Sequence, residues 1–209
     1  MPYQNRVTPF GEIIATPARG TLMGNRGCLH DQRGCIRRRY KTLRWIICQL
    51  EFKGVQRKIM TPGLWTELFF LDEATALAAG HRPCAYCQRA RFELFRELWA
   101  AANPALANGV RPAAPVIDAA LHAERITAMG QKVTYPAKLS DLPTGTMVSM
   151  GEDMRAFLVY QSRLLPWQPA AYGAPISCSL AETVQVLTPH SIVQTLAAGY
   201  PVVLHTTSA

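Results

Sequence analysis

The first half of the chain alternates between apolar runs of strand type and apolar runs of helix type. Residues 43–52 are rich in β-branched and aromatic side chains, which favour a strand. The Lys53-Gly54 turn and the alternating residues 55–60 predict that this strand forms a β-hairpin. Residues 12–15 predict an extended arm or edge strand, because prolines and glycines surround them. In residues 88–102 the apolar side chains follow the helical period, which predicts a helix with one buried face.

The second half has shorter apolar segments separated by turn residues. Residues 146–150 and 155–160 flank the turn Gly151-Glu152-Asp153, and this arrangement predicts a second β-hairpin. Further strands are predicted at residues 164–167, 183–187 and 201–205, and helices at residues 116–129 and 192–198, the last with Ser191 as its cap. The pattern is typical of an α+β protein whose C-terminal part is rich in strands.

A segment rich in proline and asparagine separates the two halves. Residues 103–115 contain three prolines and two asparagines, which interrupt helices and favour turns. We therefore expect a domain boundary here. The predicted organisation is a small N-terminal α/β module over residues 1–103 and a mixed α/β, strand-rich unit over residues 112–209.

Basic residues are concentrated near the N-terminus. The chain has a formal net charge of +8, and residues 1–60 carry 12 Lys and Arg against 3 Asp and Glu. Such an excess favours a nucleic-acid partner, because phosphate contacts supply most non-specific affinity; a solvated basic surface is the alternative. The predicted phosphate contacts lie in or just after the glycine-rich residues 23–40: Arg26, Arg33, Arg37, Arg38, Arg39 and Arg44.

Composition predicts a globular protein without a membrane segment. Hydrophobic residues make up 49% of the chain, yet no apolar run approaches the roughly 18 residues that a membrane-spanning helix needs. The first residues have neither the apolar core of a signal peptide nor an amphipathic transit pattern, so we expect a cytoplasmic protein. The six cysteines have irregular spacing, which favours metal binding or free thiols over a disulfide framework.

Residues 72–88 combine a helix start, a helix stop and a pair of cysteines. Asp72 is a good N-cap, and Gly80 suits the left-handed position after a helix. Cys84 and Cys87 then follow a proline at Cys-x-x-Cys spacing, which lets both thiolates reach one tetrahedral zinc ion. Two unligated thiols and a redox pair are the alternatives. A redox pair usually follows a strand, whereas a helix precedes this one.

A zinc ion needs two further nitrogen or sulfur ligands. Cys48 is the first candidate, since the strand predicted over residues 43–52 could present its thiol to the cysteine pair. His30 is the second, because a loop can fold over a metal site and imidazole is a good zinc ligand. Cys28, Cys35 and His81 rank lower. The predicted ligand set is Cys84, Cys87, Cys48 and His30.

A family resemblance covers about residues 23–90 and is most specific over residues 69–87, FFLDEATALAAGHRPCAYC. This stretch resembles part of the metal-binding module of the bacterial Ada alkylation-repair protein and its small relatives. An aromatic strand, an alanine-rich helix, an Arg-Pro turn and Cys-x-x-Cys follow in the same order there. Gly24-Asn25 and His30 extend the likeness. The resemblance implies a small zinc-binding α/β unit that contacts DNA in repair or regulation.

The same resemblance brings in one catalytic alternative. In the Ada protein four cysteines bind zinc, and one of them accepts a methyl group from a DNA phosphotriester. Cys48 is the position here that could act as such a zinc-thiolate alkyl acceptor. The family pattern has a second cysteine four residues later, where this chain has Phe52. The resemblance therefore supports zinc and DNA binding better than methyl transfer.

His122 and Glu124 form the His-x-Glu motif of a second enzymatic alternative. With Pro-Cys-x-x-Cys at residues 83–87 they resemble the two signatures of zinc-dependent deaminases, but in reversed order. The motif lies in a predicted helix, where Asp118, His122 and Arg125 could instead form a polar stripe. A hydrolase or nuclease-like reaction that uses His122 and Glu124 is the remaining alternative.

Overall fold

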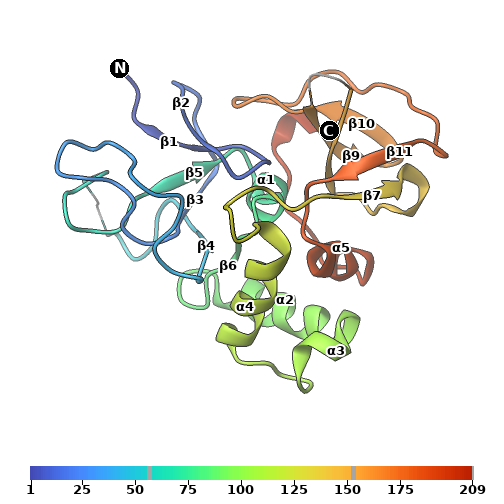
Figure 1. Cartoon of the computed structure of the whole chain (residues 1–209), viewed down its shortest axis with the longest axis horizontal. Helices are drawn as coiled ribbons and strands as arrows, with labels where there is room; N and C mark the ends of the chain where they lie inside the picture. Colours follow the sequence, from blue (N-terminus) through green and yellow to red (C-terminus); the bar gives the residue numbers. More distant parts are fainter. Residues whose placement is uncertain (56–57, 152–153, 209) are drawn as a thin grey trace.

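Two β-sheets flank a short central helix in the computed structural model of the chain (Figure 1). The structure describes residues 1–55, 58–151 and 154–208. In this part of the chain the first sheet contains β1 (Gln4–Val7), β2 (Ile13–Ala15), β3 (Leu22–Asn25), β4 (Ile46–Cys48), β5 (Leu68–Phe70) and β6 (Arg82–Pro83). The second contains β7 (Tyr135–Lys138), β8 (Met147–Met150), β9 (Arg155–Tyr160), β10 (Arg163–Pro166) and β11 (Thr183–Val186). The predicted α+β class is confirmed.

The first sheet mixes parallel and antiparallel pairs in the order β2-β1-β5-β3-β4-β6. β1 and β2 form an antiparallel edge hairpin, which confirms the edge strand predicted over residues 12–15. β4 pairs antiparallel with β3 on one side and parallel with β6 on the other. Because parallel neighbours need a long connection, β4 and β6 bring together segments that are far apart in the sequence.

The second sheet is antiparallel throughout, in the order β10-β9-β8-β11-β7. β8 and β9 form the hairpin predicted for residues 146–160; residues 152 and 153 of its predicted turn lie outside the described residues. The hairpin predicted for residues 43–60 is wrong. Only β4 forms there, and the described residues of 55–60 contain no strand. Since β3 and β6 occupy both edges of β4, no edge is left for a hairpin partner.

Helix α1 (Glu73–Ala78) is buried along its whole length and contacts both sheets. Asp72 Oδ1 accepts a hydrogen bond from the Thr75 amide at 2.9 Å, which confirms the predicted N-cap. Gly80 has a φ of +86°, as predicted for the residue that ends the helix. Alanine side chains let both cores approach the helix closely: Ala76 and Ala79 belong to one core, Ala74 and Ala78 to the other.

In the described part of the chain, four further helices contribute side chains to the core that contains Ala76 and Ala79. They are α2 (Arg89–Ala102), α3 (Pro104–Ala107), α4 (Ala114–Arg125) and α5 (His190–Ala197), with 3-10 turns η1 (Leu139–Asp141) and η2 (Thr206–Ser208). α2 buries Phe92, Phe95 and Trp99 as the periodicity predicts. The largest core cluster combines side chains of α2, α4 and α5 with the first sheet. It thus draws on both sides of the boundary expected at residues 103–112, and the division into two units stays a prediction.

The C-terminal segment closes over the start of α1. Residues 201–205 form no strand, contrary to the prediction, and run outside both sheets. Their amides bond to the carboxylates at the helix start instead: Val203 donates to Glu73 at 2.8 Å and His205 to Asp72 at 3.1 Å. The hydroxyls of Tyr172 and Tyr200 donate to the same two carboxylates. Buried acidic side chains therefore satisfy this part of the backbone.

Candidate metal centre

The parallel pairing of β4 with β6 places Cys48 beside Cys84. The register pairs Ile46 with Arg82 and Ile47 with Pro83, so Cys48 and Cys84 are the next residues of the two segments. The backbone continues the pairing, since the Cys84 amide donates to the Ile47 carbonyl at 2.9 Å. Sheet register, rather than sequence proximity, brings these two thiols together.

The turn of residues 84–87 adds the third cysteine. The Tyr86 amide donates to Cys84 Sγ at 3.4 Å, and the Gln88 amide donates to the Cys84 carbonyl at 3.1 Å just before α2 begins. The sulfur atoms of Cys48, Cys84 and Cys87 all lie within 4.8 Å of one another. Thiolates bound to one tetrahedral zinc ion at about 2.3 Å would be roughly 3.8 Å apart, so the spacing fits a metal.

The three thiols influence one another's protonation. The hydrogen bond with Cys48 is the main cause that lowers the pKa of Cys84 to about 5. The same contact, followed by burial, raises the pKa of Cys48, and burial raises the pKa of Cys87. Three negative sulfur atoms at this spacing repel one another unless a cation lies between them. A bound metal would therefore favour the deprotonated form of all three.

The cysteine group has one apolar side and one side that opens to a cavity. Met23 and Phe69 pack against the apolar side, and Trp65 packs against the cysteines and also lines the cavity. The cavity has a volume of about 300 Å³, and the cysteines share its wall with Asn25, Thr42, Arg44, Phe52 and Tyr86. Phe52 and Tyr86 meet edge to face with ring centroids 5.0 Å apart, and Lys53 Nζ lies over both rings. A ligand that reached the sulfur atoms would therefore meet cations and aromatic rings.

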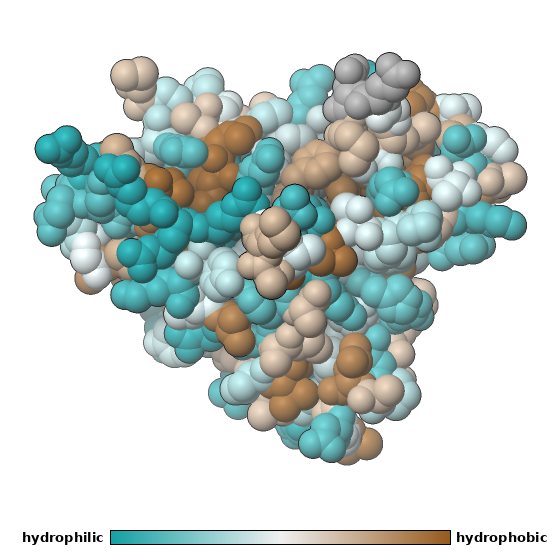
Figure 2. All heavy atoms as spheres, in the orientation of Figure 1, coloured by the Kyte–Doolittle hydropathy of each residue, from teal (hydrophilic) through white to brown (hydrophobic). Residues whose placement is uncertain are grey.

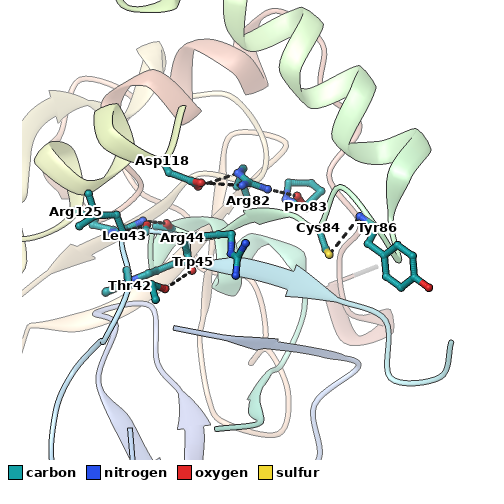
Figure 3. A network of polar contacts seen from close by, with 11 residues as sticks. Thr42, Leu43, Arg44, Trp45, Arg82, Pro83, Cys84, Tyr86, Asp118 and Arg125 are labelled. Atoms are coloured by element: carbon teal, nitrogen blue, oxygen red, sulfur yellow. Dashed lines mark hydrogen bonds and ion pairs between the residues drawn. The ribbon is translucent and has the colours of Figure 1, made fainter. Parts of the chain in front are cut away.

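A buried ion pair connects the cysteine turn to α4 (Figure 3). Arg82 Nε and Nη2 each donate to a carboxylate oxygen of Asp118 at 2.9 Å. The two side chains are only 2% and 8% exposed. Arg82 also donates to the Pro83 carbonyl at 3.0 Å, next to Cys84. The pair therefore holds β6, the strand that immediately precedes Cys84. From the sequence, Asp118 is predicted only to belong to a polar stripe on a helix. Its neighbouring residues do not identify Arg82 as its ion-pair partner.

His30 lies outside the cysteine group, which corrects the predicted ligand set. Among the described residues, the cluster that could hold a metal contains Cys48, Cys84 and Cys87 alone. Both ring nitrogens of His30 are engaged elsewhere: Nδ1 lies 2.7 Å from Thr66 Oγ1 and Nε2 lies 3.1 Å from the Thr61 carbonyl. These contacts hold the loop against the segment before β5, so His30 is a structural residue.

The lower-ranked ligand candidates also lie elsewhere. Cys35 is exposed, and Cys28 Sγ contacts the His30 carbonyl at 3.7 Å. His81 is fully buried, and its Nε2 accepts a hydrogen bond from Arg26 Nε at 3.2 Å. All six cysteines are free thiols, in agreement with the expectation that they form no disulfide framework.

His122 and Glu124 do not form a common site. They lie two residues apart on α4, a spacing that points side chains to different faces of a helix. Glu124 Oε2 accepts hydrogen bonds from the Ser191 amide at 3.1 Å and from its hydroxyl at 2.6 Å, so the carboxylate caps the start of α5. His122 Nδ1 accepts from Arg125 Nη2 at 3.0 Å. The predicted acid–base pair is therefore two separate structural contacts, and Ser191 lies within α5 rather than at its cap.

The predicted phosphate contacts divide into one buried and five exposed arginines. Arg26 is 1% exposed, which removes it from any surface contact. Arg37 pairs with Asp31 at 2.6 Å, and Arg39 donates to the Gly130 carbonyl. The other three exposed arginines form no ion pair and no side-chain hydrogen bond among the described residues: Arg33, Arg38 and Arg44. Hydrophilic side chains gather on the side of the molecule where the N-terminal strands and loops lie (Figure 2).

Comparison with known proteins adds no identification. No protein-family model, no curated protein and no solved structure matches this chain. Among the described residues, every helix is too short or too polar to cross a membrane. The likeness to the Ada module therefore stays an expectation from residues 69–87.

Proposed function

We propose that the protein binds zinc through Cys48, Cys84 and Cys87 and contacts nucleic acid beside this metal, with DNA the better candidate than RNA. One observation carries the proposal. The three sulfur atoms converge at the wall of a cavity that Arg44 also lines, so the metal site and an exposed cation share one opening. The preference for DNA comes from the resemblance to the Ada module.

Zinc fits the donor set better than a hard cation does. Three thiolates are soft ligands, which select zinc and similar metals, whereas calcium and magnesium prefer oxygen. No fourth protein ligand joins the group among the described residues. Zinc usually takes four ligands, and a site with three protein ligands has room for a water or a substrate atom. The cavity beside the cysteines could admit such a ligand.

Nucleic-acid contact is supported by charge and by side-chain type. Arg33, Arg38 and Arg44 are exposed, and the segment of residues 1–60 carries a strong excess of basic residues. Exposed arginines bind phosphate oxygens through planar, paired donors. Phe52 and Tyr86 at the same opening could stack on an unpaired base, which is sequence-independent.

The zinc claim is tested by metal analysis of protein purified under reducing conditions. We expect about one zinc ion per chain, and we expect its loss in Cys48→Ser, Cys84→Ser and Cys87→Ser. Cys35→Ser is the matched control, because that exposed thiol lies outside the group. Absence of zinc from the wild-type chain, or full retention in the Cys84→Ser/Cys87→Ser double variant, would contradict the proposal.

The binding claim is tested by fluorescence anisotropy with duplex DNA and RNA at several salt concentrations. Affinity should fall with salt, and Arg44→Gln and Arg38→Gln should each reduce the slope of log affinity against log salt by about 1. Arg163→Gln is the control, since Arg163 lies in β10 of the second sheet. Affinity that does not depend on salt, or equal effects of all three variants, would refute backbone contact by these arginines.

A second candidate is alkyl transfer to Cys48. Cys48 lines the cavity together with Arg44, which would place a phosphotriester beside a thiolate. In this reaction the sulfur–carbon bond forms, the carbon–oxygen bond of the triester breaks, and the phosphodiester anion leaves. Mass spectrometry of the chain after incubation with methyl-phosphotriester DNA tests it. A methyl group on Cys48, absent in Cys48→Ser, is expected; an unmodified wild-type chain rejects it.

A further inference from the structure

A second cavity lies where the β1–β2 hairpin meets the end of α4. It has a volume of about 340 Å³ and is separate from the cavity beside the cysteines. Four cationic side chains line it, and we call it the four-cation cavity: Arg26, Arg39, Arg125 and Lys132. Among the described residues of its wall, the only acidic one is Glu12, which is exposed. The wall therefore carries a large excess of positive charge.

Arg26 is buried in this wall with an unused donor. Its Nε donates to His81 at 3.2 Å and its Nη1 to the Gly11 carbonyl at 2.9 Å. Nη2 is buried and has no hydrogen-bond partner in the described part of the chain. It lies 3.8 Å from the position that a Cβ on Gly11, another residue of the wall, would take. A buried guanidinium donor without an acceptor is costly unless a ligand supplies one.

Arg125 shows the same pattern, and the half-buried Lys132 also bonds to a neutral acceptor. Arg125 is 1% exposed and donates to the carbonyls of Gly80 at 2.9 Å and Leu43 at 2.6 Å, while its Nε is buried with no partner in the described part of the chain. Lys132 Nζ donates to the Ala78 carbonyl. All these acceptors are neutral. They hold the positive groups in place without offsetting their charge.

The cations also repel one another. The guanidinium carbons of Arg26 and Arg125 each lie 3.9 Å from the ring centroid of Trp45. Burial and then the charges of these two arginines lower the pKa of Lys132 to about 7. Burial is also the main cause that lowers the pKa of Arg125 to about 9. The carboxylate of Asp118, which raises the pKa of Arg125, already forms the ion pair with Arg82. An anion in the cavity would relieve this repulsion.

We propose that the four-cation cavity binds a phosphate group, either free or at one end of a small organic molecule. A phosphate dianion brings acceptor oxygens to a wall in which Arg26 and Arg125 each keep an unpaired donor, and it offsets two of the four charges. Apolar side chains complete the wall, among them Phe10, Ile14 and Ile126. The apolar part of an organic phosphate could contact these side chains. The site needs neither the metal nor the exposed arginines of the proposed function.

Calorimetric titration of the full chain with inorganic phosphate and with a nucleoside monophosphate tests the site, in a phosphate-free buffer of low ionic strength. Saturable binding of one ligand per chain is expected. Arg39→Gln and Lys132→Met should each weaken it by at least about tenfold, because each removes a charge-assisted hydrogen bond. Arg19→Gln and Lys138→Met are matched controls that remove exposed charges outside this wall and should leave the affinity unchanged.

Thermal unfolding distinguishes a binding defect from a folding defect. Lys132→Met removes one of four repelling charges, so the unliganded variant should melt no lower than the wild type, yet phosphate should no longer raise its melting temperature. If the nucleoside monophosphate binds more tightly than inorganic phosphate, the cavity is assigned to an organic phosphate. If the two ligands bind equally, the cavity is assigned to the free anion. No saturable binding of either ligand to the folded wild type, or equal losses in Arg19→Gln and Lys138→Met, overturns the proposal.

Discussion

Removal of Asp118 should destabilise the protein strongly. Its carboxylate accepts both 2.9 Å hydrogen bonds from Arg82, and the two side chains are 2% and 8% exposed. In Asp118→Ala the guanidinium stays buried and loses its counter-ion. Loss of one partner of a buried ion pair costs about 3–5 kcal/mol of unfolding free energy. For a chain of this length that cost lowers the melting temperature by roughly 6–20 °C.

Urea and thermal unfolding followed by circular dichroism measure this loss. Arg111→Ala is the matched control, because it removes an ion pair with Glu93 that is largely exposed and should contribute little. The double variant Arg82→Met/Asp118→Leu should recover most of the stability, since apolar side chains remove the buried charge altogether. An Asp118→Ala loss below about 1 kcal/mol, or a double variant no more stable than the single one, would refute the argument from burial.

Asp118→Ala should also weaken the metal site. Arg82 donates to the Pro83 carbonyl and lies two residues before Cys84, so loss of its partner frees the strand that carries one ligand. We expect Asp118→Ala to release zinc to a chelator faster than the wild type does, while Arg111→Ala releases it at the wild-type rate. Equal rates in all three proteins would show that the ion pair does not position the cysteine turn.

Three further changes test other parts of the structure. Lys132, whose pKa is lowered to about 7, should make the protein more stable as pH rises from 7 to 9, by at most about 1.4 kcal/mol per pH unit, and Lys132→Met should lose this gain. Glu124→Gln should weaken the start of α5 by about 0.5–2 kcal/mol without changing zinc content. Gly80→Ala should cost about 1–3 kcal/mol, because φ is +86° and a Cβ would meet Arg125 Cδ at 2.5 Å.

Urea unfolding checks the three changes in stability, and metal analysis checks the zinc content of Glu124→Gln. The unfolding free energy rises with pH because, above pH 7, the unfolded chain holds the Lys132 proton more tightly than the folded chain does. A wild type and Lys132→Met with the same pH profile would contradict it. Loss of zinc from Glu124→Gln would contradict the interpretation that Glu124 only caps α5. Gly34→Ala is the control for Gly80, since its φ is +78° but a Cβ there meets nothing within 4 Å; equal losses would exclude the contact with Arg125.

Local signals account for the elements that were predicted correctly. α1 begins after a capping aspartate and ends before a glycine, and the contacts of Asp72 and the backbone of Gly80 confirm both. β8 and β9 follow from alternation around a short turn. The hairpin over residues 43–60 was predicted from the same kind of signal and is wrong, because β4 forms its pairs with distant strands. A turn signal indicates where a chain can reverse, but it does not state which edges of a sheet are free.

The predicted metal ligands also show that local sequence signals do not determine long-range contacts. Cys84 and Cys87 are three residues apart in the sequence, and this spacing indicates a metal site without further information. Cys48 joins them through the register of β4 and β6, and the sequence could only rank it among several thiols. His30 ranked next, yet Thr61 and Thr66 engage both its ring nitrogens. Whether an imidazole reaches a metal depends on its neighbours, which the residue type does not reveal.

The sequence by itself determined the properties that depend on composition and on neighbouring residues. These are the α+β class, the caps of α1, the cysteine pair and the basic N-terminal segment. Only the tertiary structure decided which groups meet across long separations: Cys48 with the pair, Arg82 with Asp118, and Arg26 with Arg125 at Trp45. The physical reason is that helix and turn preferences act over a few residues, whereas burial and charge pairing depend on which surfaces the fold brings into contact.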